Sequence, residues 1–422
     1  MLRYGGAATR MRQNLHKTPA EKAAVLDRLS YLVGSRETLR GICGTAAKRP
    51  FDAAVTDFLN DLSKVLMANQ DARAFSDVVT FAFWIRKSAT ARLREQFDKK
   101  DENIRLGRGV AFHIAPSNVP VNYAYSLAAG LLTGNANLVR VPSKEFEQVR
   151  IINRAINDTL NMETHAEMRD YICLVRYDRS REVNDLLSEL SDTRVIWGGD
   201  ETIAELRKSP LGPRANEITF ADRFSIAMID SDCYLARMDQ QKIAEGFYND
   251  TYLTDQNACT SPRMVVWLGT QPAKAKEIFW NNLHMLVREK YAFQPIQGVN
   301  KLTGGFLLAA AHEGVKIVSG PDNLIVRVQV PNLFNNLMEF KDNSGYFFEY
   351  DCNDILALKN LCDDLRCQTV AYIGDRKMFI PLLESGVKGI DRIVPVGQTM
   401  DFSFIWDGYN LYERLTRTVR IA

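Results

Sequence analysis

Cys259 lies in a loop of small and polar residues, and this loop is the segment of the chain best suited to chemistry. The loop runs Asp255-Gln256-Asn257-Ala258-Cys259-Thr260-Ser261-Pro262-Arg263 and leads directly into the apolar segment Met264–Leu268. A thiol at the mouth of a strand is placed to act as a nucleophile. Most free cysteines are instead buried as small hydrophobic residues, so both interpretations of Cys259 stay open on residue chemistry alone.

Asn118 is a second candidate, because it lies between two prolines in the segment His113-Ile114-Ala115-Pro116-Ser117-Asn118-Val119-Pro120. The prolines stiffen the segment, and a stiff loop suits an amide donor that must be in place before charge develops. The alternative is that Asn118 forms a turn and caps the helix expected from Val121. A thiolate together with such a donor is the pair that acyl transfer through a thioester requires.

Three further segments each follow a predicted strand and are candidates for a nucleotide site: Pro116–Pro120, Arg140–Lys144 and Gly198–Asp200. In α/β sheets, nucleotides bind beyond the carboxyl ends of the strands, so all three segments could line one ligand crevice. Arg140 and Lys144 could contact a phosphate or form a solvated basic loop. The complete Gly-x-Gly-x-x-Gly fingerprint follows none of the predicted strands.

The composition indicates an ordinary globular protein. The 422 residues are 46% hydrophobic and 25% charged, and the net charge of +2 comes without a Lys- or Arg-rich tract that would mark a groove for nucleic acid. No apolar run approaches the roughly 20 residues of a membrane span, and no signal peptide is visible. Seven irregularly spaced cysteines favour a reduced, cytoplasmic protein. Cys362 and Cys367 lack a second pair or a nearby histidine, so no metal site is predicted.

The spacing of apolar residues along the chain predicts the helices and strands that must position these residues. Residues 19 to about 98 are predicted to be helical over Ala20–Val33, Phe51–Met67 and Ala72–Arg92. Glu102–Ile114 is predicted to be a hairpin that turns at Gly107-Arg108-Gly109. From Pro120 onward, strands alternate with helices, which predicts parallel sheets with helices on both faces.

The predicted strands are Asn137–Val141, Asp170–Arg176, Thr193–Trp197, Ser225–Ile229, Met264–Leu268, Leu324–Val330, Phe347–Tyr350 and Thr369–Ile373. The predicted helices are Val121–Leu132, Phe146–Thr159, Ser180–Leu190, Glu201–Lys208, Gln241–Asn249, Pro272–Val287, Asn353–Leu365 and Arg376–Leu383. Two α/β domains with a cleft between them form the simplest architecture for this order.

Taken together, these segments resemble the aldehyde dehydrogenase superfamily and, within it, the LuxC-type acyl-CoA reductases. IAPSNVPVNYAYSLAAGLLTGNANLVRVPSK is similar to the cofactor loop, helix and strand, with Asn118 in the place of the oxyanion asparagine. NACTSPRMVV resembles the nucleophile loop, with Cys259 in the catalytic place and Arg263 in that of the usual arginine. VIWGGDETI looks like the glycine turn under the nicotinamide ribose and pyrophosphate. GIDRIVPVGQTMDFSFIWDGYNL resembles the LuxC C-terminal part, and the resemblance covers roughly residues 100 to 415.

The resemblance implies an aldehyde dehydrogenase-like α/β fold with a Rossmann-like cofactor domain and a catalytic domain. We expect an N-terminal helical part of the cofactor domain over 1–98, the cofactor domain over 99–235, the catalytic domain over 236–395, and a C-terminal return segment over 396–422. The residues implied to bind the cofactor are Ala115, Pro116, Ser117, Arg140, Pro142, Ser143, Lys144, Gly198 and Gly199.

Two departures from the superfamily pattern bear on the reaction. Hydrolytic members carry a water-activating glutamate before the strand that is here Ser225–Ile229, whereas this chain has Thr219-Phe220-Ala221-Asp222-Arg223, with Glu217 about two residues out of register. Loss of that base suits transfer of the acyl group to or from a thiol. Lys144 stands where many NAD enzymes have an acid, which favours the 2′-phosphate of NADP(H).

The resulting hypothesis is an enzyme that reduces an acyl-CoA or acyl-carrier thioester to an aldehyde with NADPH. Cys259 would carry the acyl group, and Asn118 with the Cys259 backbone N–H would hold the oxyanion. An acyl-activating enzyme is a possible partner. The alternatives are an aldehyde dehydrogenase that forms the acid, with Glu217 as a possible base, and a non-redox acyl-transfer subunit.

A homo-oligomer is also expected. The predicted hairpin near Glu102–Ile114 and a final strand over Leu415–Ile421 lie outside the two alternating cores, and an unpaired strand edge tends to be covered by another chain. The resemblance implies that these strands pair across a two-fold interface. The alternative is that they pair within their own chain.

Overall fold

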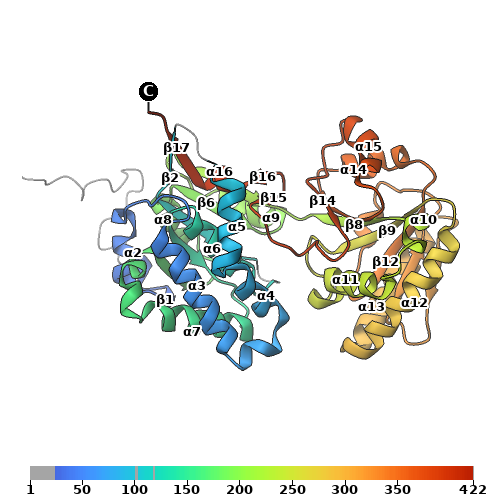
Figure 1. Ribbon diagram of the computed structural model, residues 1–422, viewed down its shortest axis with the longest axis horizontal. Coiled ribbons are helices and arrows are strands. Elements are labelled where there is room, and N and C mark those ends of the chain that lie inside the picture. The colour runs from blue at the N-terminus through green and yellow to red at the C-terminus, as the bar shows by residue number, and fades with distance from the viewer. Residues whose placement is uncertain (1–23, 100–102, 117–118, 422) are drawn as a thin grey trace, which may run out of the picture. The chain divides into compact units, whose positions relative to one another are not determined.

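The computed structural model describes residues 24–99, 103–116 and 119–421, which form two compact units (Figure 1). One unit comprises the described residues up to Ala221 together with those from Tyr409 onward, and the other comprises Asp222–Gly408. Each unit contains a mainly parallel sheet with helices packed on it, so the predicted α/β class with two α/β domains is confirmed. Residues 222–235, which we expected in the cofactor domain, belong to the second unit.

The first unit is built on a six-stranded sheet with the order β1-β5-β4-β3-β6-β7. Strands β3 to β7 run parallel, and β1 runs antiparallel to β5 at one edge. The chain begins the parallel part at β3, moves outward to β4 and β5, and then returns to β6 and β7 on the other side. The order therefore reverses between β3 and β6, which is a topological switch point of the nucleotide-binding kind.

The strands of this sheet are β1 (Ser30–Val33), β3 (Val110–Ile114), β4 (Ala136–Arg140), β5 (Ile172–Arg176), β6 (Thr193–Trp197) and β7 (Asn216–Phe220). The helices of the unit are α2 (Arg36–Gly41), α3 (Ala53–Ala68), α4 (Ser76–Trp84), α5 (Lys87–Phe97), α6 (Asn122–Leu132), α7 (Glu147–Leu160), α8 (Arg181–Leu190), α9 (Asp200–Arg207) and α16 (Leu411–Leu415). Strand β16 covers Tyr409–Asn410.

The helix predicted over Ala20–Val33 is wrong at its C-terminal end. Ser30–Val33 form β1 and pair with β5. Gly34 then adopts a φ of 75°, which ends the strand in a left-handed turn. A short apolar run such as Tyr31-Leu32-Val33 fits either period, and here pairing with the sheet decides its structure.

The hairpin predicted over Glu102–Ile114 is also wrong. Strand β3 enters the parallel sheet, while β2 (Ile104–Gly107) pairs antiparallel with β17 (Thr416–Val419). The chain between β2 and β3 is held by Asn135, whose Oδ1 accepts hydrogen bonds from Arg108 N (2.7 Å) and Gly109 N (3.2 Å). This contact redirects the chain away from a local hairpin.

The second unit is built on a seven-stranded sheet with the order β10-β11-β12-β9-β8-β13-β14, parallel except for β10. Its strands are β8 (Phe224–Asp230), β9 (Pro262–Leu268), β10 (Lys316–Ser319), β11 (Val326–Gln329), β12 (Tyr346–Asp351), β13 (Cys367–Ile373) and β14 (Arg392–Pro395). Its helices are α10 (Ser231–Leu235), α11 (Gln240–Thr251), α12 (Pro272–Lys290), α13 (Pro295–Ala311), α14 (Lys359–Asp363) and α15 (Ile380–Glu384). The short strand β15 covers Ile405–Trp406.

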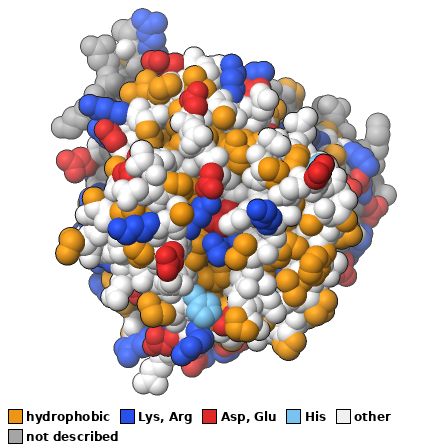
Figure 2. Space-filling view, turned by 90° about the vertical axis from the view of Figure 1, so that its right-hand side faces the viewer, with side chains coloured by type: hydrophobic (Ala, Val, Ile, Leu, Met, Phe, Trp, Pro, Cys, Tyr) orange, Lys and Arg blue, Asp and Glu red, His pale blue; other side chains and the backbone are white. Residues whose placement is uncertain are grey.

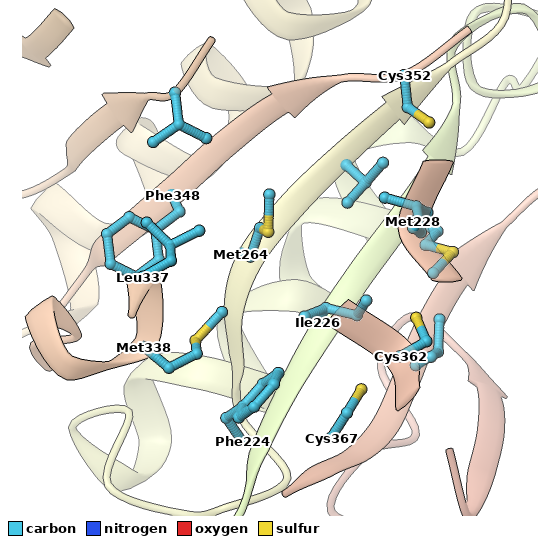
Figure 3. Packing of buried hydrophobic residues seen from close by; sticks show 14 of the residues in the cluster. Phe224, Ile226, Met228, Met264, Leu337, Met338, Phe348, Cys352, Cys362 and Cys367 are labelled. Carbon is cyan, nitrogen blue, oxygen red and sulfur yellow. The ribbon is translucent and has the colours of Figure 1, made fainter. Parts of the chain in front are cut away.

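Alternating side chains of this sheet form two separate cores. Phe224, Ile226 and Met228 of β8 pack into one core with Met264 and Phe348 (Figure 3). The intervening residues of the same strands belong to the core on the opposite face. The period of two in a buried parallel strand therefore gives each face of the sheet its own apolar layer.

Three of the seven cysteines lie in the first of these cores. Cys352, Cys362 and Cys367 are all buried among its apolar side chains (Figure 3). Across residues 24–99, 103–116 and 119–421, no three His, Cys, Asp or Glu side chains are grouped so that they could hold a metal ion. Within the same ranges, no helix combines the length and the apolar character that a membrane crossing requires.

One face of the protein carries charges of both signs together with apolar side chains (Figure 2). Figure 2 shows Lys and Arg side chains interspersed with Asp and Glu on the face that it presents, and no block of one sign dominates that face. Helix α13 in the second unit exposes Ile296, Val299, Phe306 and Leu307, each by more than half of its side chain.

Candidate functional site

The Cys259 loop begins with two consecutive left-handed residues. Asp255 and Gln256 have φ values of 50° and 59°, which turn the chain sharply after α11 so that it can enter β9. Such conformations cost about 1–3 kcal/mol each and persist only where the surroundings hold them.

Gln256 supplies the contacts that hold this turn. Its fully buried side chain donates from Nε2 to Pro262 O (2.8 Å) and Tyr346 O (3.0 Å). Its Oε1 accepts from Gly345 N (2.9 Å) and Tyr346 N (3.2 Å). Both donors and both lone pairs of the carboxamide are therefore used, and the loop is clamped between β9 and β12.

Arg263 braces the loop from its other end. Its Nη1 donates to Asp342 O (2.7 Å) and to Asn343 Oδ1, while Asn343 Nδ2 donates to Asn257 Oδ1 (2.9 Å). Burial lowers the pKa of Arg263 to about 10. The guanidinium thus connects the start of β9 to residues on the N-terminal side of Cys259.

Lys301 of α13 fixes the segment on which Gln256 depends. Its buried Nζ donates to Asn323 O (2.6 Å), Leu324 O (3.1 Å) and Ser344 O (2.7 Å), and burial lowers its pKa to about 8. Ser344 N in turn donates to Asp255 O (3.0 Å). Nothing in the sequence around Lys301 indicated this role, because its partners are all backbone carbonyl groups from distant segments.

Cys259 itself is partly buried, and its carbonyl oxygen accepts a hydrogen bond from Ser225 Oγ (2.7 Å). Burial raises the pKa of its thiol to about 12, and the negative charge of Asp407 raises it further. The Gln368 side chain and the positive charge of Arg223 lower the pKa of the same thiol. The resting side chain at neutral pH is therefore the protonated thiol.

Asp407 and Gln368 form a buried pair beside this thiol. Gln368 Nε2 donates to Asp407 Oδ1, and burial raises the pKa of Asp407 to about 6. Arg223 lies nearby and forms an ion pair with Asp391 (Nη1 to Oδ2, 2.6 Å). Neither Gln368 nor Asp407 was predicted from the sequence. The only signal for Gln368 was a polar pair, Gln368-Thr369, next to an apolar run.

The candidate nucleotide segments of the first unit lie at one edge of its sheet. Strand β3 lies between β4 and β6, and all three run parallel, so the residues after their carboxyl ends are neighbours. Ala115 N donates to Arg140 O (3.1 Å), and Gly198 N donates to Phe220 O (3.1 Å). Ala115 and Gly198 thus lie at the carboxyl ends of β3 and β6, on either side of the switch point.

Arg140 and Lys144 follow the carboxyl end of β4. The Arg140 guanidinium lies over the Tyr177 ring at 4.5 Å and donates from Nη2 to Tyr177 O (3.4 Å). Lys144 is exposed, with its Nζ 5.0 Å from the centre of the Phe146 ring. Pro142 is buried and Ser143 is exposed between them. In nucleotide-binding folds this strand end is where the ribose 2′ position is recognised.

Gly198 and Gly199 form the turn into α9. Gly199 is the N-cap residue of this helix, and an added Cβ there would meet no described heavy atom within 4 Å. The first N–H groups of a helix such as α9 lack partners within the helix, which favours binding of a phosphate. Asp200 and Glu201 in the first turn oppose an anion at the same end.

His113 and Glu217 are both held in structural contacts. The buried His113 ring contacts Ser126 Oγ (2.7 Å) and Asn137 Oδ1 (2.9 Å), and burial lowers its pKa to about 4. Glu217 accepts from Arg194 at one carboxylate oxygen and from Arg207 Nε at the other (2.8 Å). Ser117 and Asn118 lie outside the described residues.

The sequence of this chain is similar to those of known acyl reductases. A family model described as "Acyl-CoA reductase (LuxC)" matches residues 88–291. The long-chain acyl-protein thioester reductase of Vibrio harveyi is 24% identical over 305 residues, which are 70% of this chain and 60% of that protein. The long-chain acyl-protein thioester reductase 2 of Photobacterium leiognathi is 22% identical over 167 residues, 39% of this chain. The matched part of the chain spans 60% and 33% of the lengths of these two relatives.

Solved structures extend the similarity to nearly the whole chain. An oxidoreductase from Marinobacter aquaeolei has a TM-score of 0.65 at 13% identity, with 95% of this chain and 90% of that chain covered. Aldehyde dehydrogenase 21 from Physcomitrella patens has a TM-score of 0.64 at 10% identity, with 96% and 90% covered. The resemblance to the LuxC-type acyl-CoA reductases is therefore confirmed, and the chain has the fold of the aldehyde dehydrogenase superfamily.

Proposed function

We propose that this protein reduces an acyl thioester to an aldehyde, with Cys259 as the nucleophile. The observation that carries the proposal is the presentation of Cys259, which is partly exposed on a loop that Gln256 and Arg263 hold from both ends. The match of residues 88–291 to the acyl-CoA reductase family supports the reaction class.

The proposed chemistry begins when the sulfur of Cys259 attacks the thioester carbonyl carbon. The bond between that carbon and the leaving sulfur breaks, and the leaving thiolate takes up the proton that Cys259 gives up. The acyl group is then held on Cys259 as a new thioester. NADPH, if held by the first unit through Arg140 and Lys144, would supply the hydride that reduces this group. Release of the aldehyde breaks the bond to Cys259, and a proton from solvent restores the thiol.

We propose Asn118 and the Cys259 backbone N–H as the donors that stabilise the oxyanion. This assignment follows the family resemblance of the segment around Asn118. A preorganised donor of this kind accelerates acyl transfer because it is already oriented when negative charge develops on the carbonyl oxygen.

The first unit fits a nicotinamide cofactor. Its parallel strands have the order of a nucleotide-binding half, and the open glycine turn follows β6 at the switch point. We propose Arg140 and Lys144 as contacts for the 2′-phosphate of NADPH. Glu145, the acid next to Lys144, has its carboxylate paired with Arg176 (3.4 Å). The other proposed cofactor contacts are Ala115, Pro116, Ser117, Pro142, Ser143, Gly198 and Gly199.

Oxidation of an aldehyde to the acid is the less favoured alternative. That reaction needs a carboxylate that can take a proton from water, and both oxygens of Glu217 already accept hydrogen bonds from guanidinium groups. A non-redox acyl-transfer subunit is the second alternative, and it would not bind NADPH.

The substrate class follows the two curated relatives, which are named for long-chain acyl-protein thioesters. We propose a fatty acyl thioester, carried by CoA or by a protein. The decisive experiment supplies acyl-CoA and acyl-carrier thioesters of increasing chain length with NADPH, and follows both the absorbance of the reduced cofactor and the aldehyde. Acid formation without a thiol requirement would favour the dehydrogenase, and acyl transfer without NADPH binding would favour the acyl-transfer subunit.

A further inference from the structure

Gln368 is a polar side chain in the middle of the second sheet. It belongs to β13, which lies between β8 and β14, and it is fully buried. Its Nε2 donates to Asp407 Oδ1, while its Oε1 has no hydrogen-bond partner among the described residues. Burial of an amide with unused hydrogen-bonding capacity is costly, and such groups commonly mark functional positions.

Backbone contacts place Gln368 next to Cys259. Ser225 Oγ donates to Cys259 O (2.7 Å) and accepts from Thr369 N (3.3 Å). The nucleophile loop and the Gln368-Thr369 peptide are therefore joined through a single hydroxyl group. The Gln368 side chain also lowers the pKa of the Cys259 thiol, as expected for a donor close to the sulfur.

Asp407 determines which way the Gln368 amide faces. An ionised carboxylate only accepts hydrogen bonds, so Nε2 and not Oε1 must face Asp407. The second hydrogen on the same Nε2 then remains available for a neighbouring acceptor. Asp407 is itself fixed in a left-handed conformation (φ 48°), and its Oδ2 has no hydrogen-bond partner among the described residues.

The other charges around this pair come from three elements of the same unit. Arg223 precedes β8 and pairs with Asp391, and Arg392 of β14 lies over the Trp406 ring at 4.3 Å. Arg392 donates to the backbone at Thr399 O (3.2 Å) and Asp401 O (3.2 Å). Asp250 of α11 accepts from Gly397 N and Thr399 N. Each of these neighbours already has a partner of its own.

We propose that Gln368 is a catalytic hydrogen-bond donor to the sulfur of Cys259, and that Asp407 is a positioning residue that orients its amide. The proposal rests on the proposed role of Cys259 as nucleophile. Gln368 stabilises the thiolate, whereas the charge of Asp407 opposes ionisation of the thiol. Removal of the Gln368 donor should therefore slow alkylation of Cys259, and removal of the Asp407 charge should accelerate it.

Alkylation of Cys259 by iodoacetamide tests the roles of Gln368 and Asp407. It needs neither substrate nor cofactor, so its outcome is independent of the proposed reduction. Below the pKa of a thiol, its alkylation rate is proportional to the thiolate fraction. Gln368→Met keeps the volume and removes the donor, so we expect alkylation of Cys259 to slow by about ten-fold or more. Asp407→Asn keeps an acceptor oxygen and removes the charge, so we expect alkylation to accelerate. Mass spectrometry of the Cys259 peptide gives the rates across a pH series.

The exposed thiol of Cys233 provides an internal reference in every sample, because its charged neighbours are Asp230, Asp232 and Asp375. Its rate should be the same in all variants. An unchanged Cys259 rate in Gln368→Met would overturn the role of Gln368. A slower rate in Asp407→Asn would overturn the effect assigned to the Asp407 charge. Asp407→Leu also lacks the charge but removes the acceptor, so equal rates in Asp407→Leu and Asp407→Asn would overturn the positioning role of Asp407. If Gln368→Met does not fold, Gln368→Ala provides the donor-free variant, and Asp407→Asn still tests the predicted acceleration.

Discussion

At the scale of single residues, Cys259 is accessible to solvent, yet its environment disfavours the thiolate form. The residue is partly exposed, while burial of its thiol raises the pKa to about 12. A resting thiol resists unwanted alkylation and oxidation, because the thiolate is the reactive form. The nucleophile would then form when a substrate approaches and its leaving sulfur accepts the proton.

Replacement of Cys259 by alanine should abolish both acylation and aldehyde formation. No other residue of the loop can form a thioester, so incubation with radiolabelled acyl thioester should leave the variant unlabelled. Cys233→Ala is the matched control, since Cys233 is also accessible but lies on α10. This variant should be labelled to the same extent as the unmodified protein. Labelling of Cys259→Ala would mean that another cysteine is the nucleophile.

Gln256 should contribute strongly to stability, because its side chain satisfies four backbone groups. Gln256→Met retains the volume and leaves those groups unpaired, at about 1–3 kcal/mol for each buried group that finds no substitute. We expect the free energy of unfolding in urea to fall by at least about 2 kcal/mol. Gln241→Met, at an exposed position of α11, should change it by less than about 0.5 kcal/mol. Equal effects of both variants would contradict the clamp.

At the scale of elements, the sequence predicted most strands of both sheets to within a few residues. Strands such as β6 and β9 are short apolar runs bounded by polar or glycine residues, and local sequence determines them. The missed β7 (Asn216–Phe220) carries charged and polar residues, and it is a strand because it pairs with β6. Helix α13 was not predicted, and its sequence contains Gly298, Gly304 and Gly305, which are poor helix formers.

The candidate site was predictable only in part, because tertiary structure brings some of its residues together. Cys259, Arg140 and Gly198 each follow or precede a recognisable strand. Gln368 and Asp407 are 39 residues apart in sequence and meet only through tertiary structure. Contacts of this kind leave no local pattern, because a buried polar pair is defined by its partner and not by its neighbours in the chain.

The end of β4 should determine cofactor preference. Lys144→Glu replaces an exposed cation with an anion, and a charge-assisted contact to a phosphate contributes about 1.5–3 kcal/mol. We expect NADPH affinity to fall by about ten-fold or more while NADH affinity changes little, as measured by fluorescence titration. Lys64→Glu, at an exposed position of α3, is the control for net charge. Equal use of both cofactors by the unmodified protein would remove the basis for this assignment.

The anchoring of α13 through Lys301 should depend on pH. Burial lowers the pKa of Lys301 from 10.5 to about 8, so between these values the unfolded chain binds more protons than the folded one. Linkage then makes the contribution of Lys301 to stability rise as pH increases from about 8 to about 10.5. The stability of the unmodified protein relative to Lys301→Met should rise over this range in urea unfolding. A difference that is flat or falls with pH would show that the lysine is not held in this way.

At the scale of the whole molecule, β2 and β17 form a two-stranded sheet that is separate from the two main sheets. These two strands pair with each other within the chain, which is the alternative that we considered from the sequence. Within the described residues, each has only one neighbouring strand. Their outer edges therefore still present backbone N–H and C=O groups to which a strand of another chain could pair.

We therefore retain the prediction of a homo-oligomer that is joined through these strands. Light scattering during gel filtration should give a mass of at least twice the 47.8 kDa of one chain at micromolar concentration. Deletion of residues 416–422 removes β17 and should give monomers with reduced activity, because β2 loses its partner strand. Deletion of residues 420–422 alone keeps β17 intact and should leave the mass of the assembly unchanged. A single-chain mass for the full-length protein would show that the pairing of β2 with β17 is sufficient and that the outer edges stay uncovered.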